Sequence, residues 1–123
     1  MNYKTDRFSS VKGSFSIKKE SLTDERIFCK QCMAYIAHKD DILIIEGSAS
    51  HYKRNPAGIF FSLICLSNAP GCGILGDYTS EHSWFSGYEW SIALCLGCLS
   101  HLGWHFIGKG SFYGLIVNRI IGI

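Results

Sequence analysis

Two pairs of cysteines constrain this chain more than any other feature of its sequence. Cys29 and Cys32 form one C-x2-C pair, and Cys95 and Cys98 form a second, with residues 33–94 between the pairs. Two residues between ligands allow one tight turn to direct both sulfurs at a single ion, and two such turns complete the tetrahedron that Zn²⁺ accepts in closed structural sites. The spacing therefore predicts one structural zinc ion that joins two distant hairpins.

Disulfides and a redox-active C-x-x-C motif are the alternatives to zinc. A redox motif needs only one pair, followed by the start of a helix. The N-terminus lacks the apolar core of a signal peptide, so we expect a cytoplasmic or nuclear protein, in which disulfides are rare. Cys65 lies in an apolar segment and is expected to be buried and inert, whereas Cys72 lies in a glycine-rich stretch where a thiol can be exposed and reactive.

The composition is that of a globular protein without a nucleic-acid or membrane signature. Hydrophobic residues make up 47% of the chain, and the formal net charge is only +2. No run approaches the roughly 18 apolar residues that a membrane span needs. Residues 1–26 are rich in charged residues, serine and threonine, which predicts a flexible leader followed by one domain over residues 27–123.

From Ile27 onward, short apolar segments separated by glycines predict an all-β domain with little helix. Residues 69–77 contain Pro70 and three glycines and are expected to form a turn. The segments expected to contain strands are 27–40 (strand, turn and strand), 41–47, 55–66 (a turn and then a buried strand), 88–95, 101–108 and 111–123.

All three tryptophans fall between Trp84 and Trp104, with Trp90 and Trp104 on the expected strands that flank the second cysteine pair. They form either a tryptophan-rich core or an aromatic cage for a flat ring or a cation. A cage needs polar groups at its mouth, and the candidates are Glu81, His82, Ser83 and Asn55. The sequence does not fix whether Trp90 and Trp104 share one face of the sheet.

The run EHSWFSGYEWSIALCLGCLSHLGWHF closely resembles the thalidomide-binding domain of the cereblon family, also called the CULT domain. The segments FCKQC, NPAGIFF and SFYGLIVNRI agree with the same family, so the resemblance covers about residues 27–120. It implies a β-tent, in which two antiparallel sheets meet at a steep angle and the zinc site pins them together. It also implies a cage made by Trp84, Trp90 and Trp104, with Phe106 as a further wall.

The resemblance implies a binding module and not an enzyme. In the family, the cage accepts glutarimide, related cyclic imides such as thalidomide, and uracil-like rings. The suggested natural ligands are C-terminal cyclic imides, which form when Asn or Gln residues of damaged proteins cyclise. The turn His82-Ser83-Trp84 matches the one that holds the imide N–H and a carbonyl, and Asn55 and Pro56 match the loop that closes over the ligand.

Two other functions remain open from the sequence, and one family role is not expected of this chain alone. Zinc-bearing methionine sulfoxide reductases have a related fold and an aromatic pocket, but they need a nucleophilic cysteine near that pocket. A cage for a methylated ammonium would use a carboxylate, and Glu81 and Glu89 are candidates. The family serves substrate recognition by a ubiquitin ligase. We find no LON-like domain and no region that would dock the ligase adaptor, so adaptor binding by this chain alone is not expected.

Overall fold

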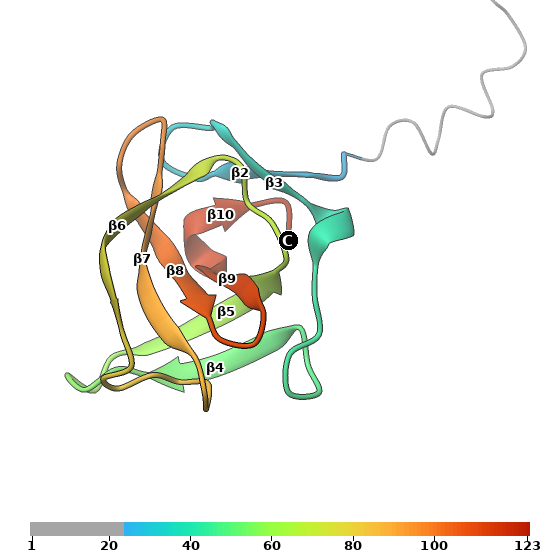
Figure 1. Cartoon of the computed structure of the whole chain (residues 1–123). Coiled ribbons are helices and arrows are strands. Elements are labelled where there is room, and N and C mark those ends of the chain that lie inside the picture. The colour runs from blue at the N-terminus through green and yellow to red at the C-terminus, as the bar shows by residue number, and fades with distance from the viewer. Residues whose placement is uncertain (1–23) are drawn as a thin grey trace, which may run out of the picture.

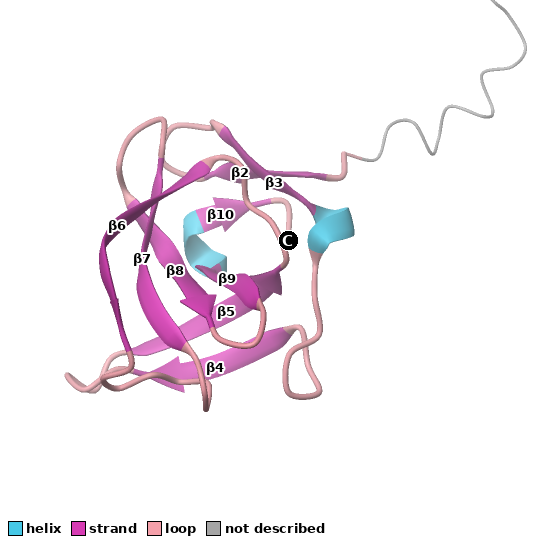
Figure 2. Ribbon diagram, in the orientation of Figure 1, coloured by secondary structure: helices cyan, strands magenta, loops and turns pink. Residues whose placement is uncertain are grey.

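The fold is described from a computed structural model, which describes residues 24–123. In this part of the chain, nine strands form two antiparallel sheets (Figures 1 and 2). The only helices in residues 24–123 are two short 3-10 turns, η2 (Lys39–Asp41) and η3 (Val117–Arg119). The prediction of an all-β fold with two antiparallel sheets and little helix is confirmed. No helix among the described residues is long and apolar enough to cross a membrane.

The smaller sheet has the strand order β10-β2-β3, and the larger sheet has the order β4-β5-β9-β8-β7-β6. Figure 1 shows the small sheet lying across one end of the curved large sheet. The strands are β2 (Arg26–Cys29), β3 (Tyr35–His38), β4 (Ser50–Arg54), β5 (Phe60–Leu66), β6 (Cys72–Thr79), β7 (Glu89–Cys95), β8 (His101–Ile107), β9 (Ser111–Ile116) and β10 (Ile120–Ile121).

Two hydrophobic cores lie on the two sides of the large sheet. The first, which we call the inter-sheet core, joins the large sheet to the small one and includes Ile27, Ile36, Leu115 and Ile120. The second, the aromatic core, lines the concave side of the large sheet and is made of Leu63, Cys65, Phe85, Trp104, Phe106, Phe112 and Ile116. A shift in register between β7 and β8 lets Leu102 join the inter-sheet core although Trp104, two residues later, joins the aromatic core.

Two predicted segments are wrong. Residues 41–47 form no strand, because only isolated bridges hold them and Glu46 and Gly47 (φ 50° and 87°) reverse the chain in a tight turn. Residues 69–77 are not a turn throughout, because β6 begins at Cys72. Its glycines serve the strand: Gly76 takes a positive φ of 90° beside a register shift, and a Cβ on Gly73 would lie 2.8 Å from Leu96.

The last predicted strand, over residues 111–123, is in fact two strands in different sheets. β9 pairs with β5 and β8, and η3 then redirects the chain so that β10 pairs with β2. β4 was not predicted at all, because its inward-facing residues His51 and Lys53 are polar. The predicted leader, residues 1–26, lies outside the described residues except for 24–26, so the division of the chain at residue 26 stays a prediction.

Candidate functional site: a four-cysteine cluster and an aromatic cavity

The four predicted metal ligands lie at the meeting point of the two sheets. Cys29 ends β2 and Cys95 ends β7, and each starts a turn that carries the second cysteine of its pair. The two turns have the same hydrogen bonds and the same left-handed residue after the second cysteine. The matching features are Met33 N–H to Cys29 O (2.8 Å) and Leu99 N–H to Cys95 O (2.7 Å), with φ of 64° at Met33 and 66° at Leu99.

The spacing of the sulfurs fits a metal and excludes disulfides. All four Sγ atoms lie within 4.8 Å of one another, with 3.8 Å between Cys29 and Cys98 and 3.6 Å between Cys32 and Cys95. A disulfide would need about 2.05 Å. Thiolates about 2.3 Å from a tetrahedral zinc ion stand about 3.8 Å apart, so this donor set fits a closed site with four sulfur ligands.

Hydrogen-bond donors lie beside the sulfurs of Cys95 and Cys98, where they favour the thiolate form. The Ser100 hydroxyl lies 3.2 Å from the Cys98 sulfur, and hydrogen bonds from the side chain and backbone of Ser100 lower the pKa of Cys98 to about 7. The Gly97 N–H donates to the Cys95 sulfur over 3.3 Å. A Cβ on Gly97 would lie 3.1 Å from the Cys32 sulfur, so the close approach of the two turns suits glycine there. Such outer hydrogen bonds orient metal ligands and tune their charge.

The structure resolves which tryptophans share a face. β7 and β8 pair so that Trp90 lies opposite Phe106 and Ile92 lies opposite Trp104. Residues two apart on a strand point the same way, so Trp90, Trp104 and Phe106 all project from the concave side of the large sheet. Trp104 is 9% exposed and Phe106 only 1%, whereas Trp90 is half-buried. The deep wall is therefore Trp104 and Phe106, with Trp90 nearer the rim.

Trp84 completes the group from the loop between β6 and β7. Its ring centroid lies 4.8 Å from that of Trp104, with the planes at 80°. Its Nε1–H donates to the Arg54 carbonyl oxygen over 2.9 Å, and the Trp90 Nε1–H donates to the Glu81 carbonyl over 2.8 Å. Both indole donors are thus used by the protein, and two of the three rings are fixed in orientation.

These rings surround a cavity of about 260 Å³. The lining residues are Asn55, Pro56, His82, Trp84, Trp90, Trp104 and Phe106. Seven of the eight residues predicted to bind a ligand are therefore brought together, although a ligand role for them stays a prediction. The eighth, Ser83, lies beside a different hollow and donates its hydroxyl hydrogen to the Phe85 carbonyl over 3.1 Å. His82 has a positive φ of 60°, in a turn region at the cavity mouth.

Neither remaining cysteine lines this cavity. Cys65 is fully buried, as expected, and burial raises the pKa of its thiol to about 11. Cys72 is only 9% exposed, which overturns the expectation of an exposed thiol, and burial raises its pKa to about 12. It is buried because the glycine-rich stretch forms β6, where Cys72 pairs with Cys95. Neither thiol is ionised near neutral pH, so neither is an activated nucleophile.

Sequence reasoning missed three groups that hold the tryptophan walls of the cavity from behind or beside them. Phe61 packs edge-on against Trp104 with ring centroids 5.2 Å apart, and His101 does the same at 4.9 Å. Phe61 belongs to the NPAGIFF segment, so its aromatic character was the available signal. The Arg54 carbonyl that orients Trp84 could not be predicted from the sequence, because every residue has a backbone carbonyl and the side chains do not show which one accepts a hydrogen bond.

Comparison with known proteins agrees with this geometry. No family model matches the sequence. Cereblon of Danio rerio is 38% identical over an alignment of 102 residues that covers 76% of this chain and 23% of the relative. Cereblon of Gallus gallus is 37% identical over 102 residues, with the same coverage. Cereblon of Drosophila simulans is 30% identical over an alignment of 119 residues that covers 93% of this chain and 20% of the relative.

The chain spans about a quarter of the length of the vertebrate relatives it matches. The aligned region includes most of the described fold, and the fold carries the four-cysteine cluster and the three tryptophans that the resemblance led us to expect. The chain is therefore homologous to one segment of cereblon and carries a cereblon-like (CULT) domain.

Proposed function

We propose that this domain is a non-catalytic binding module whose aromatic cavity takes a cyclic imide. The observation that carries the proposal is the convergence of three indole rings and Phe106 on one small cavity, with two indole donors already bonded to the protein backbone. The ligands we propose are glutarimide and thalidomide-like rings, uracil-like rings, and cyclic imides at the C-terminus of a protein chain.

The size and chemistry of the cavity suit such a ring. At about 260 Å³ the cavity lies below the usual range for drug-sized ligands, which favours a compact ring. Aromatic walls would bury the ring's CH₂ groups, each contributing about 0.8 kcal/mol. The Asn55 side-chain oxygen already accepts the Ile59 N–H over 2.9 Å, which leaves the Asn55 amide hydrogens for an imide carbonyl. His82 supplies the other polar group of the lining.

The role we propose for the four-cysteine cluster is to stabilise the fold that carries the cavity. We propose that it holds one Zn²⁺, because the sulfur spacing and the all-thiolate donor set suit that ion. Four protein ligands leave no open position for substrate or water. Cys29 ends β2 of the small sheet, Cys32 follows it in the next turn, and Cys95 ends β7, so the ion would tie the small sheet to the strand of the large sheet that carries Trp90.

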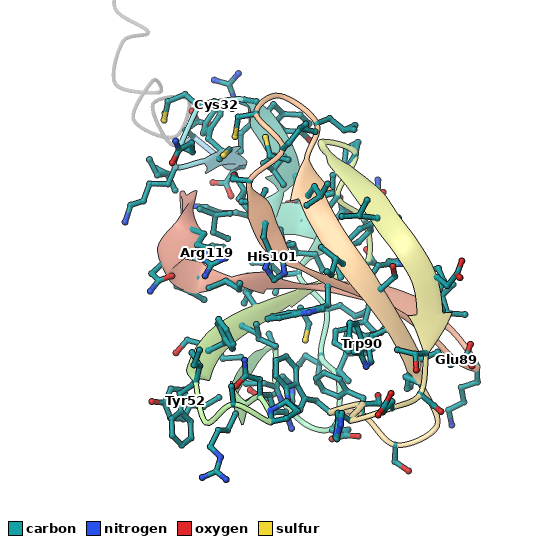
Figure 3. All side chains as sticks on the ribbon, turned by 90° about the vertical axis from the view of Figure 1, so that its left-hand side faces the viewer. Cys32, Tyr52, Glu89, Trp90, His101 and Arg119 are labelled. Carbon is teal, nitrogen blue, oxygen red and sulfur yellow. The ribbon has the colours of Figure 1, made fainter. Side chains whose placement is uncertain are left out.

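The alternatives have less support. A reductase needs a thiolate at the pocket, and no cysteine lines the cavity. A methyl-ammonium reader would gain from a carboxylate, and none of the lining residues is acidic. Glu89 points outward in Figure 3, and the Glu81 side chain is 75% exposed beside His82. A neutral ring leaves no buried charge unpaired, which favours the imide.

The proposed role in the cell is recognition of proteins that carry an imide at their C-terminus. The family resemblance links such recognition to ubiquitin-ligase substrate selection, and we assign only the recognition step to this domain. Binding of a ligase adaptor is not assigned to these residues, because the chain matches about a quarter of the vertebrate cereblons.

Tryptophan fluorescence provides the test, since all three tryptophans line the cavity. We expect saturable quenching with glutarimide and much weaker binding of N-methylglutarimide, which lacks the imide donor but keeps the ring. Trimethyl-lysine should not compete. Equal binding of glutarimide and its N-methyl form would remove the imide from the proposal, and tighter binding of trimethyl-lysine would replace it.

A further inference from the structure

Within residues 24–123, the first strand of the large sheet has one edge without a partner strand. Among the described residues, β4 pairs only with β5, and its alternate residues turn their backbone groups toward or away from that partner. The Asn55 N–H donates to Ile59 O and the Cys65 N–H donates to Ala49 O, which places the odd-numbered residues on the paired side. The backbone N–H and C=O groups of Ser50, Tyr52 and Arg54 therefore point away from β5.

This edge is closed at both ends and open in the middle. At one end, the Ser48 hydroxyl donates to the Ser50 carbonyl (2.8 Å) and accepts from the Ser50 N–H (3.0 Å). At the other end, the Trp84 indole N–H donates to the Arg54 carbonyl (2.9 Å). Within residues 24–123, no hydrogen bond uses the Tyr52 N–H, the Tyr52 C=O or the Arg54 N–H. Unpaired edges of this kind accept a further strand.

The open stretch leads into the aromatic cavity. Trp84, a cavity wall, contacts the edge at Arg54, and the next residue, Asn55, lines the cavity itself. An extended chain that lies along this edge and ends beyond Arg54 would therefore bring its last residue to the cavity mouth.

We propose that β4 pairs with an extended peptide that runs parallel to it and places a C-terminal cyclic imide in the cavity. This inference rests on the proposed function. The direction follows from geometry, because the C-terminal end of the peptide must lie at the C-terminal end of β4. In a parallel ladder, one residue of the added strand lies opposite a residue of the first strand and bonds that residue's two neighbours. Its N–H donates to the carbonyl of the preceding neighbour, and its carbonyl accepts from the N–H of the following neighbour. The Tyr52 C=O and the Arg54 N–H flank Lys53 in this way.

The register assigns a position to each peptide residue. If the imide lies opposite Asn55, the residue before it lies opposite Arg54, and the second residue before it lies opposite Lys53. That second residue makes both backbone hydrogen bonds to β4. The residue next to the imide turns its own N–H away from β4, because bonding groups alternate along a strand.

The outer face of β4 adds a preference for certain side chains. The Tyr52 and Phe60 rings stack with centroids 5.0 Å apart and planes at 10°, yet Tyr52 is 69% exposed and Phe60 52%. Figure 3 shows Tyr52 projecting from the molecule. The Arg54 guanidinium lies 5.9 Å from the Phe60 ring centre. We expect an apolar residue opposite Tyr52, third before the imide, and an acidic residue opposite Arg54, directly before it.

The test compares a free aminoglutarimide, acetylated on its amine, with a synthetic hexapeptide that ends in the same ring. We expect the peptide to bind about tenfold more tightly, as two hydrogen bonds and the Tyr52 contact would give. N-methylation of the second residue before the imide should abolish that gain. N-methylation of the residue directly before the imide is the matched control and should leave the affinity unchanged.

Variants of the protein test whether the tighter binding of the peptide comes from contacts with β4. Tyr52→Ala should weaken the peptide about threefold to tenfold and leave the free imide unaffected, whereas Tyr35→Ala, which removes an exposed tyrosine of the small sheet, should change neither. Equal affinity of peptide and free imide would overturn the β4 proposal while the cavity assignment stands. Loss only on N-methylation next to the imide would overturn the parallel register. If neither probe binds, the proposed function itself fails.

Discussion

The two cores of this domain differ in composition and in what they enclose. In the described part of the chain, the buried residues of the inter-sheet core are Ile, Leu, Ala and Cys, with no aromatic ring among them. The aromatic core has four aromatic rings among its seven buried residues and continues into the cavity. Figure 3 shows Cys32 at the end of the molecule that carries the small sheet and Trp90 well away from it.

This difference suggests that one core mainly stabilises the fold and the other mainly recognises a ligand. Branched aliphatic side chains pack two sheets closely and leave no room for a ligand. Flat rings that meet edge to face, such as Phe85 against Phe106 at 4.9 Å and 78°, make rigid walls that can stand around a space. The inter-sheet core and its cysteines should therefore control unfolding, and the aromatic end should control binding.

Removing the proposed zinc ion should have the largest effect. Structural zinc sites release about 10–16 kcal/mol on binding, which matches or exceeds the net stability of about 5–15 kcal/mol of a typical domain. We expect a strong chelator, or Cys29→Ala, to unfold the domain in circular dichroism melts and to abolish imide binding with it. Cys65→Ala, in the aromatic core, is the control and should keep full metal content at a cost on the order of 1 kcal/mol. A chelated protein with an unchanged melt would contradict the assignment.

A cavity in the inter-sheet core should have the next largest effect. Leu115 is fully buried there, so Leu115→Ala should lower the free energy of unfolding by about 2–5 kcal/mol. Urea denaturation measures this change, and the imide affinity of the folded variant should stay within about twofold, since Leu115 does not line the cavity. Ile44→Ala, at a position that is 68% exposed, should cost less than about 0.5 kcal/mol. A large loss of imide affinity in Leu115→Ala would contradict the assignment of stability to the inter-sheet core and of binding to the aromatic end.

The reverse pattern is expected for Trp84. Trp84→Ala should weaken imide binding at least about thirtyfold, or 2 kcal/mol or more, because a wall of the cavity is lost. Its cost in stability should be smaller than that of Leu115→Ala, because Trp84 is only half-buried. Trp84→Phe keeps a ring but loses the bond to Arg54, so an intermediate affinity is expected. Calorimetric titration would detect the opposite outcome, an alanine variant that binds like the parent.

The smallest effect concerns pH. Burial lowers the pKa of His105 below its ordinary 6.5, and the Tyr78 hydroxyl lies 2.7 Å from His105 Nδ1, where it can donate to the neutral ring. Between the two pKa values the unfolded chain binds more protons than the folded one. Stability is therefore full above pH 6.5 and falls as the pH drops from there to the folded pKa. His105→Gln should reduce the slope of that part of a stability–pH profile, and the slope that remains is expected from His101, whose pKa is also lowered by burial.

The sequence was a good guide wherever apolar pattern and chemistry coincided. β5, β7 and β8 are apolar and bounded by turn residues, and each was predicted. The cysteine turns were predicted because ligand chemistry fixes their spacing. β6 was missed because its glycines, which in a sequence indicate a turn, here serve a bulged strand.

The remaining features depend on pairings between distant segments. β4 carries polar residues on its inner side, His51 and Lys53, which lie against Phe85 from another loop. Its place at the edge of the sheet follows from the strand order, and no local pattern encodes that order. The tryptophans of the cavity were predicted from a family resemblance, whereas the backbone carbonyls that fix two of them could come only from the structure.

The pairing of β2 with β10 has a mechanical consequence. The two strands are antiparallel, with Ile121 opposite Phe28, and Gly122 lies directly over the Arg26 carbonyl. A force that pulls Asp24 and Ile123 apart would load these hydrogen bonds one at a time, as in opening a zip, and not all together in shear. β10 has only two residues, so it should peel away at low force, and Cys29, the last residue of β2, marks where that peeling would meet the cysteine cluster as the first strong resistance.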